Sequence, residues 1–535
     1  MVASPHALAS AAGLRVLQTG GNAIEAAIAA ASTIAVVYPH MNSLGGDNLW
    51  LIYDARSGSV RALLACGASG AACTIEAYRS AGHAREIPRR GVLAANTVPG
   101  AVDGWFEAYG YSRERLAGKL AVSALLADAV SYAEHGFPVT PSQSHWTRRN
   151  VGFAASPFGG LEALDGFRRT FLKRDGEPYA RGERMCVPEV AATLRTIANG
   201  GRDAFYRGPI AAAIVRFLHE RGGLLTEADF AGYRSRWEDP LSLPYRCWTL
   251  YNTPPPTQGL TSLQILNVLQ RFEPAALARV PADFYHVMVE ATKQAFVDRD
   301  AWIADPDFHF APIARLLSSE RAVKHAAAID RTRAASPAAS APAGGGDTVW
   351  LGVVDEMGNA VSLIQSIYFD FGSGVIPDGT GVLLQNRGSS FSLDASLPNS
   401  LAPQKRPFHT LNPAMALRNG VPELVYGTMG GEGQPQTQAA IATRILDLGM
   451  DVQAAIDAPR WIYGRTWGQP TSGLAIESRA GEDVIDELRR RGHALDVIDA
   501  WDERVGHAQA IRIDPDTAMR FGGADPRGDG LAVGF

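Results

Sequence analysis

The 535-residue sequence has few cysteines and no histidine pattern that would bind a metal. Its four cysteines show no ligand spacing, and the closest pair, Cys66 and Cys73, is seven residues apart. We therefore expect buried or inert thiols in a reducing compartment. The twelve histidines show neither a His-x-x-x-His pattern nor a mixed Cys/His spacing, so the sequence predicts no zinc site, and we expect no cofactor.

The sequence also lacks a surplus of positive charge and a long apolar run. A formal net charge of −5 argues against nucleic acid and anionic membranes as partners. The most apolar run, residues 23–37, is shorter than the ~20 residues that a membrane span needs, carries Glu25 and ends at Tyr38-Pro39. It predicts a buried core helix. Because the first six residues lack a basic segment, we expect no signal peptide and a cytoplasmic protein.

Helical and strand patterns alternate along the chain without an internal repeat. Helices are expected at 22–37, 188–198, 209–221, 260–269, 282–303, 437–448 and 451–458. Strands are expected at 48–53, 349–354, 360–369, 381–385, 423–427 and 508–513. Helices mixed with antiparallel hairpins favour sheets sandwiched between helical layers.

A low-complexity segment meets an apolar strand at Gly344-Gly345-Gly346-Asp347-Thr348. Residues 334–343 have no periodicity, whereas residues 349–354 read as a strand that is buried on both faces. One interpretation is an interdomain linker that ends at a strand. The other is an N-terminal nucleophile hydrolase, which cleaves its own chain before the nucleophile. The freed α-amine, with an unperturbed pKa of ~8, would then be the general base for the Thr348 hydroxyl.

A second motif, Gly427-Thr428-Met429-Gly430-Gly431-Glu432-Gly433-Gln434, lies between a strand and a helix. Adjacent glycines can direct two backbone N–H groups at one point, which is the geometry of an oxyanion hole. A plain tight turn remains an alternative. A phosphate-binding loop is disfavoured because no Gly-Lys-Ser/Thr follows.

Together these residues resemble the γ-glutamyltranspeptidase family. The matching segments, in the family's order, are Gly20-Gly21-Asn22-Ala23, Gly45-Gly46-Asp47, Val98-Pro99-Gly100, Gly346-Asp347-Thr348, Gly358-Asn359-Ala360-Val361-Ser362, Phe371-Gly372-Ser373-Gly374, Asn412-Pro413, Gly430-Gly431, Asp457-Ala458-Pro459-Arg460 and Asp525-Pro526-Arg527-Gly528-Asp529-Gly530. The resemblance covers nearly the whole chain. It implies an α+β fold, the four-layer αββα sandwich of N-terminal nucleophile hydrolases, made as a single-chain proenzyme.

The resemblance also implies a division of the chain and a set of catalytic roles. Residues 1–347, with a flexible low-complexity tail at 329–347, would form a large subunit, and residues 348–535 would form a small one. The two would stay together as an αβ heterodimer, with further pairing left open. The resemblance assigns cleavage to the bond between Asp347 and Thr348, the nucleophile to Thr348, the oxyanion hole to Gly430 and Gly431, and a supporting hydroxyl to Ser366.

The substrate-binding positions depart from the family pattern. The family's arginine for the α-carboxylate of glutamate would fall within residues 65–72, which contain no arginine. The acid for the α-ammonium would fall at Ser390, an asparagine at Tyr368, and two serines at His409 and Thr410. Losing these ligands together argues against a γ-glutamyl substrate, because an unpaired buried ammonium costs several kcal/mol.

A cation has been gained at Arg387, whose planar guanidinium suits a carboxylate. With His409 beside it and Tyr368 narrowing the site, we expect a pocket for a small anionic amide. This combination resembles the oxamate amidohydrolase branch of the family, which implies hydrolysis of oxamate to oxalate and ammonia.

Blander interpretations stay open for each of these residues. Arg387 could form a salt bridge within the small subunit, His409 could be a hydrogen-bonded structural histidine, and Tyr368 could serve packing. At the level of the whole protein, the alternatives are γ-glutamyl transfer or glutathione hydrolysis, acylase activity on an uncharged or dicarboxylic acyl chain, and a non-catalytic binding protein.

Overall fold

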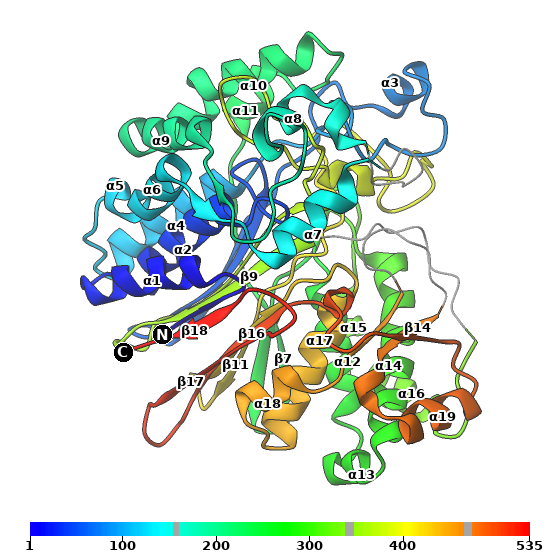
Figure 1. Cartoon of the computed structure of the whole chain (residues 1–535). Coiled ribbons are helices and arrows are strands. Elements are labelled where there is room, and N and C mark those ends of the chain that lie inside the picture. The colour runs from blue at the N-terminus through cyan, green and yellow to red at the C-terminus, as the bar shows by residue number, and fades with distance from the viewer. Residues whose placement is uncertain (153–159, 337–346, 465–472) are drawn as a thin grey trace.

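The computed structural model describes residues 1–152, 160–336, 347–464 and 473–535. Two antiparallel sheets lie face to face, and a layer of helices covers the outer face of each (Figure 1). This is the four-layer αββα sandwich of the expected α+β class, so that prediction is confirmed. The two ends of the chain meet in one sheet, where β1 pairs with β18.

The first sheet has seven strands in the order β18-β1-β9-β10-β2-β3-β6. Their bounds are Leu531–Val533, Val2–Ser4, Asp347–Val354, Ala360–Tyr368, Asp47–Asp54, Ser59–Ala65 and Arg236–Glu238. The second sheet has six strands in the order β17-β16-β12-β11-β8-β7. Their bounds are Arg520–Ala524, Ala508–Ile513, Val421–Thr428, Ala414–Arg418, Trp248–Asn252 and Leu241–Tyr245. Short strands β4 (Phe137–Pro138) and β5 (Arg184–Met185) pair with each other, and β13 (Trp461–Tyr463), β14 (Leu474–Glu477) and β15 (Leu495–Ile498) form a third small sheet.

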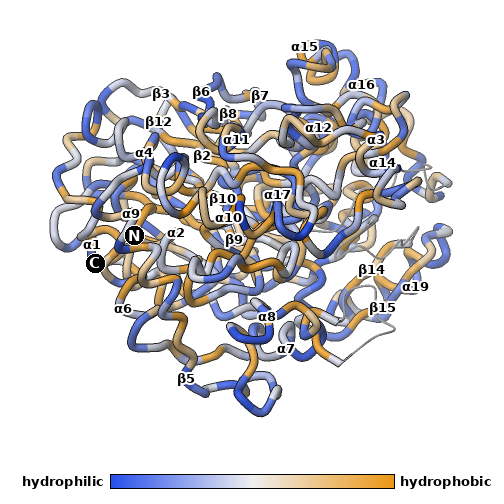
Figure 2. Tube along the Cα trace, turned by 90° about the horizontal axis from the view of Figure 1, so that it is seen from above, coloured by the Kyte–Doolittle hydropathy of each residue, from blue (hydrophilic) through white to orange (hydrophobic). Residues whose placement is uncertain are grey.

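Strands buried on both faces explain the continuous apolar runs in the sequence. In β2, Trp50 and Ile52 face the first helical layer, whereas Leu49 and Leu51 face the second sheet. This alternation follows from the two-residue period of a strand. Seen from above, the central strands around β9 and β10 are coloured mainly hydrophobic and the outer turns mainly hydrophilic (Figure 2).

The helical layers lie on opposite sides of the paired sheets. Helices on the side of the first sheet are α1 (Ala7–Gln18), α2 (Ala23–Val37), α4 (Ala101–Arg115), α5 (Val122–Leu125), α6 (Ala127–His135), α7 (Pro141–Asn150), α8 (Asp165–Phe171), α9 (Pro188–Tyr206), α10 (Pro209–His219) and α11 (Glu227–Gly232). Those on the side of the second sheet are α12 (Gly259–Leu269), α13 (Pro274–Arg279), α14 (Pro281–Trp302), α17 (Gly433–Ala442), α18 (Val452–Asp457) and α19 (Glu482–Arg490). The short helices α3 (Ile75–Ser80), α15 (Ile313–Leu316) and α16 (Ser319–Ala327) complete the set.

Helix α2 is the apolar run that the sequence predicts as a core helix. Every one of its residues is buried, and its N-terminus is closed by a capping box between Asn22 and Glu25. The Asp355 carboxylate, in the β9–β10 turn, accepts a further hydrogen bond from the Ala23 N–H at 3.0 Å. The burial of α2 within the protein explains its apolar sequence. Among the described residues, no helix is long and apolar enough to cross a membrane.

One expectation about secondary structure is wrong, and the bounds of another change. Residues 381–385 form no strand; Leu384 makes only an isolated bridge with Gly45, because positive φ angles at Phe371, Gly372 and Gly381 turn the chain repeatedly. The strand β11 carries no strong sequence signal and was not expected. The helix expected at 437–448 starts earlier, at Gly433, and its last turn, Thr443–Asp447, is a π-helix.

Both sheets contain strands from before and after Thr348. In the first sheet β9 lies between β1 and β10, and in the second β8 lies beside β11. The proposed subunits would therefore share both sheets rather than form separate domains. Of the tail expected at 329–347, residues 337–346 lie outside the described residues. Ile329 packs in the core of the second helical layer, and Asp347 belongs to β9.

Candidate active site

Thr348 lies at the beginning of the central strand β9 and is fully buried. Its hydroxyl donates a hydrogen bond to the Ser366 Oγ of the neighbouring strand β10, at 3.3 Å. Thr348 and Trp350 share one face of β9, because side chains two residues apart point the same way. Trp350 packs in the core between the sheets, so Thr348 also faces the second sheet.

Ser366 is the hydroxyl on which several groups converge. The backbone N–H of Tyr368 donates to its Oγ at 2.8 Å, and the Arg387 Nη2 donates at 3.3 Å. A register shift between Gln365 and Tyr368 interrupts the pairing of β10 with β9, and Tyr368 has a φ of 81°. This irregularity turns the end of β10 so that its backbone reaches back to its own serine.

Arg387 is completely buried in a short 3₁₀ turn, Arg387–Ser390. Its Nη1 donates to the Thr410 Oγ1 at 2.9 Å, and its guanidinium carbon lies 4.0 Å from the centre of the Tyr368 ring. Its Nε has no hydrogen-bond partner, and within the described ranges no carboxylate forms an ion pair with it. Burial lowers the pKa of Arg387 to about 10, so the side chain stays cationic at neutral pH.

Asp47, a residue to which the sequence analysis gave no role, is the carboxyl group whose charge, when ionised, acts on this arginine. Asp47 lies opposite Ser366 in the β2–β10 register and is fully buried. Its Oδ1 accepts hydrogen bonds from the N–H groups of Gly67 (3.1 Å) and Gly100 (2.9 Å). Burial raises the pKa of Asp47 to about 7, although the charge of Arg387 acts in the opposite direction.

His409 faces Asp47, with its Nε2 at 3.2 Å from the Asp47 Oδ2. Burial and the charge of Arg387 together hold the pKa of His409 well below its usual range, so the imidazole is neutral. Its Nδ1 has no hydrogen-bond partner in the described structure. His409 therefore lies against Asp47 as a neutral imidazole, which does not provide a second positive charge for a carboxylate.

Gly430 and Gly431 form the turn between β12 and α17. Both have positive φ angles, 127° and 53°, and no hydrogen bond in the described ranges uses either of their N–H groups. Gly427, just upstream, packs so closely on Trp350 that an added Cβ would lie 2.2 Å from the indole. The turn therefore follows a strand that touches the residue two positions after Thr348.

Gln258, at the end of the proline-rich loop 252–259, links this turn to the arginine site, and the sequence analysis gave it no role. Its Nε2 donates to the backbone carbonyls of Thr410 and Gly431, both at 2.7 Å. One amide thus connects the residue that holds Arg387 to the glycine turn. A polar residue at the end of a proline-rich loop was the only sequence signal for it.

Ser390 lies at the edge of this site rather than within its hydrogen-bond network. Its hydroxyl donates to the Phe408 carbonyl at 3.4 Å. With Tyr368, it lines a cavity of about 160 Å³, whose walls also carry Arg299 and Asp300. The expected site residues Thr348, Ser366, Tyr368, Arg387 and Thr410 therefore form one connected cluster, which Gln258 joins to Gly430 and Gly431.

Two sheets between two helical layers, with a threonine at the start of a central strand, define the class of N-terminal nucleophile amidohydrolases. The sequence model of the gamma-glutamyltranspeptidase family matches residues 9–535, and the chain belongs to that family. It is an enzyme that hydrolyses amide C–N bonds.

The proteins that this chain resembles are named after different substrates. The chain is 44% identical to the glutathione hydrolase-like YwrD proenzyme of Bacillus subtilis and 46% identical to the oxamate amidohydrolase proenzyme of Klebsiella pneumoniae. Both alignments cover 100% of this chain and 98% of the relative. A solved structure, cephalosporin acylase from Bacillus halodurans, matches with a TM-score of 0.89 and 36% identity, over 99% of this chain and 94% of that one.

Proposed function

We propose that the protein is a self-processing amidohydrolase that hydrolyses oxamate to oxalate and ammonia through an acyl-enzyme on Thr348. The observation that carries this proposal is Arg387, a buried cation that hydrogen-bonds to the same hydroxyl as Thr348 and forms no ion pair with a carboxylate among the described residues. Holding a charge in that state is costly unless a ligand compensates it. A substrate with its carboxylate beside the scissile amide meets that requirement.

Maturation would cleave the bond between Asp347 and Thr348. The products, residues 1–347 and 348–535, would stay together as an αβ unit because both sheets contain strands from both parts. Cleavage would free the α-amine of Thr348. An amine with an ordinary pKa of ~8 can accept a proton from the hydroxyl of the same residue at neutral pH.

Hydrolysis would then proceed in two displacements. The Thr348 Oγ1 attacks the amide carbonyl of oxamate while its proton moves to the α-amine. The N–H groups of Gly430 and Gly431, which make no other hydrogen bond in the described chain, would stabilise the oxyanion. The amide nitrogen takes the proton from the α-ammonium and leaves as ammonia. Water, deprotonated by the same amine, resolves the oxalyl ester into oxalate and free Thr348.

Arg387 would hold the substrate carboxylate with its unpartnered Nε and the N–H groups that now bind hydroxyls. Tyr368 packs against the guanidinium and limits the space on that side. Thr410 fixes the position of Arg387, and neutral His409 leaves the arginine as the single cation of this cluster. Ser390, at the cavity edge, would contact the outer end of the substrate.

A second candidate is acylase activity on a dicarboxylic acyl amide. The cavity beside Tyr368 and Ser390 carries Arg89 and Arg299 in its walls, and its volume of about 160 Å³ exceeds what oxamate needs. Arg299 already pairs with Asp300 and Glu432, which leaves Arg89 as the better candidate for a second substrate carboxylate. A longer acyl chain could place its terminal carboxylate there. γ-Glutamyl transfer or glutathione hydrolysis is less well supported, because the family's acid for the glutamate ammonium is replaced by Ser390.

A panel of four substrates separates these candidates. Oxamate, its neutral analogue oxamide, glutaryl amide and glutathione would be compared at equal concentration, with released ammonia, glutarate or glutamate measured. We expect turnover of oxamate and little of oxamide, since the two differ in the carboxylate that Arg387 would bind. Preference for glutaryl amide would favour the acylase candidate, and efficient glutathione hydrolysis would overturn the proposal.

A further inference from the structure

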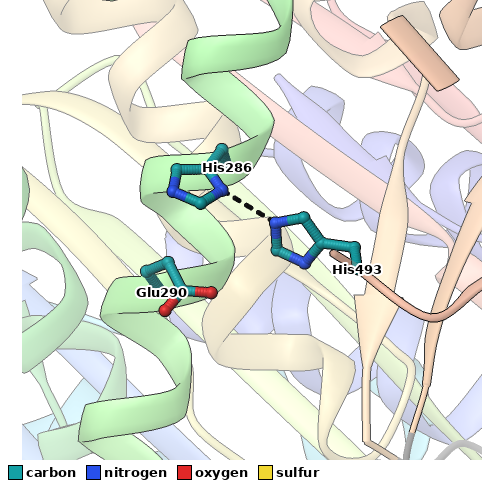
Figure 3. A group of neighbouring side chains, drawn as sticks. All are labelled: His286, Glu290 and His493. Atoms are coloured by element: carbon teal, nitrogen blue, oxygen red, sulfur yellow. Dashed lines mark hydrogen bonds between the residues drawn. The ribbon is translucent and has the colours of Figure 1, made fainter. Parts of the chain in front are cut away.

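His286, Glu290 and His493 converge inside the second helical layer, away from Thr348 (Figure 3). His286 and Glu290 lie one turn apart on α14, and His493 follows α19. The His286 Nδ1 lies 2.8 Å from the His493 Nε2, and one potential ligand atom from each residue falls within 4.8 Å of the others. All three residues are buried.

We propose that this cluster binds one divalent transition-metal ion, for which Zn²⁺ is the suitable probe. Two imidazoles and one carboxylate are ligands that Zn²⁺ accepts, with a fourth position open to water. Tetrahedral bonds of 2.0–2.1 Å place two ligand nitrogens about 3.3 Å apart. To hold a metal, the two histidine nitrogens would separate by about 0.5 Å from their hydrogen-bond distance, and the rings would turn so that both lone pairs converge on the ion.

The hydrogen bonds around His286 fix the tautomer that a metal requires. The His286 Nε2 lies 2.8 Å from the backbone carbonyl oxygen of Asp330, which can only accept, so Nε2 carries the proton. The Nδ1 lone pair therefore points at His493 and into the cluster. A backbone carbonyl on the distal nitrogen is the usual support of a metal-bound histidine. In the metal-free cluster the His493 Nε2 donates to His286, and metal binding would move that proton to the His493 Nδ1.

The hydrogen bonds of His286 are those of a neutral imidazole, so it can bind a metal without losing a proton to solvent. The charged residues near the cluster are Lys293, which contacts Glu290, and Arg491, which pairs with Asp283 and Glu487.

Lys293 is the main competitor for the carboxylate. Its Nζ lies 2.7 Å from the Glu290 Oε1, while the Glu290 Oε2 accepts the Ala335 N–H at 3.1 Å. A carboxylate offers about four lone-pair positions, so Glu290 keeps acceptor capacity for a metal. Removing the lysine charge should then strengthen metal binding, which gives the proposal a test in the direction of gained affinity.

The position of the cluster suggests what a metal would do. His286 and Glu290 precede Thr348 in the sequence, and His493 follows it. Asp330 and Ala335, which bond to His286 and Glu290, lie directly before the segment that leads to Asp347. A bound metal would therefore join the two parts of the chain and anchor the approach to the proposed cleavage point. Metal binding itself does not depend on cleavage or on the proposed substrate.

The test uses the full-length protein, stripped with a chelator and titrated with Co²⁺ as a spectroscopic substitute for Zn²⁺. We expect the visible bands of tetrahedral Co²⁺ to saturate at about one ion per chain, and Zn²⁺ to displace it and raise the thermal unfolding temperature. His493→Ala and Glu290→Gln should each weaken binding at least about tenfold. Lys293→Met should tighten it, and the control His325→Ala, on α16, should leave it unchanged.

Each outcome bears on the proposal. Absence of saturable Co²⁺ binding, or equal binding by the wild type and both ligand variants, would overturn it. If circular dichroism shows that His493→Ala is misfolded, Glu290→Gln decides, because it keeps the shape of the side chain. Loss of binding in that variant, with the His325→Ala spectrum intact, would support the site.

Discussion

Arg387 and Arg527 are both buried arginines of the segment after Thr348, but they have different partners. Arg527 forms a bidentate pair with Glu477, at 2.8 and 2.6 Å, and its Nη1 bonds to Asp525 at 3.1 Å. Among the described residues, the side chain of Arg387 donates hydrogen bonds only to the hydroxyls of Ser366 and Thr410. Carboxylates of the protein therefore balance the charge of Arg527, whereas the charge of Arg387 has no such partner among the described residues.

The pKa values around the two arginines reflect this difference in partners. Although burial opposes it, the bonds to Glu477 and the charge of Asp525 raise the pKa of Arg527, while burial lowers that of Arg387 to about 10. The two buried aspartates differ in the same way. The charges of Arg460 and Arg527 outweigh burial and lower the pKa of Asp525, whereas burial raises the pKa of Asp47 to about 7. A buried charge whose hydrogen bonds and ion pairs are all made within the protein supports the fold. A buried charge that lacks some of these partners is suited to binding a ligand.

The largest expected effect comes from Thr348→Ala, which tests whether the region around Arg387 is catalytic at all. Removing the hydroxyl should reduce amide hydrolysis by at least about 10⁴-fold, the scale seen when a nucleophile is deleted. It should also leave the chain as one band on a denaturing gel, whereas the wild type should give two. Two bands from the variant would show that an external protease cleaves the chain.

Exchanging the two arginines for methionine tests the comparison directly. Arg527→Met removes the bidentate partner of Glu477 and leaves Asp525 with Arg460 as its remaining ion-pair partner, so it should cost about 3–5 kcal/mol in the free energy of unfolding. Arg387→Met removes a charge that lacks a carboxylate partner, so denaturant unfolding should change far less. Its kcat/KM for oxamate should fall about 10²–10³-fold, because a charge-assisted contact to the substrate is lost.

Matched variants separate these roles. Arg387→Lys keeps the charge but not the planar fork, and we expect it to restore little of the activity. Turnover of oxamide, which has no carboxylate, should not respond to either Arg387 variant. Equal loss of stability in Arg387→Met and Arg527→Met would mean that both arginines are structural.

The two aspartates predict opposite dependences of stability on pH. The folded state holds the proton of Asp47 up to about pH 7, whereas the unfolded chain releases it near 3.8, so this residue makes the free energy of unfolding fall as pH rises from about 4 to about 7. Asp525, with its lowered pKa, contributes stability that is present above pH 4 and lost as pH falls below it.

Asparagine substitutions reveal these contributions in chemical unfolding measured across pH. Asp47→Asn should flatten the curve between about pH 4 and pH 7. Asp525→Asn should lower stability throughout the neutral range and remove the steep loss in acid. The same slope between pH 4 and pH 7 in Asp47→Asn and the wild type would show that Asp47 is ionised in the folded protein.

Local patterns in the sequence were sufficient for most of the fold and part of the site. The apolar helix 23–37, its Asn22 cap and the strands around Thr348 follow from hydrophobic period and capping chemistry, because their partners lie on adjacent turns or strands. The failed strand at 381–385 is also a local effect. Its apolar residues lie in a segment whose backbone turns at several positive φ angles, and a hydropathy pattern does not reveal such turns.

Contacts between distant segments were beyond the reach of the sequence. Asp47 and His409 are separated by 362 positions, and only the register of β2 against β10 brings Asp47 to the site. The same holds for His286 and His493, 207 positions apart, whose pairing no His-x-x-x-His search would find. The resemblance to a family gave expected roles for Thr348 and Ser366. It carried no information on which buried arginine lacks a carboxylate as an ion-pair partner.

The smallest expected effect is that of Ser366→Ala, and it tests whether nucleophile and arginine work as a unit. The Ser366 Oγ accepts hydrogen bonds from both Thr348 and Arg387, each at 3.3 Å, so removing it loosens two groups at once. Loss of long hydrogen bonds of this kind should lower kcat/KM for oxamate only about tenfold. In a double-mutant cycle with Arg387→Met, the two losses should be less than additive, because part of the contribution of Ser366 is made through Arg387. Ser366→Thr retains the hydroxyl and should recover most of the activity. Strictly additive losses would mean that Ser366 serves Thr348 alone and that Arg387 binds substrate independently of the nucleophile.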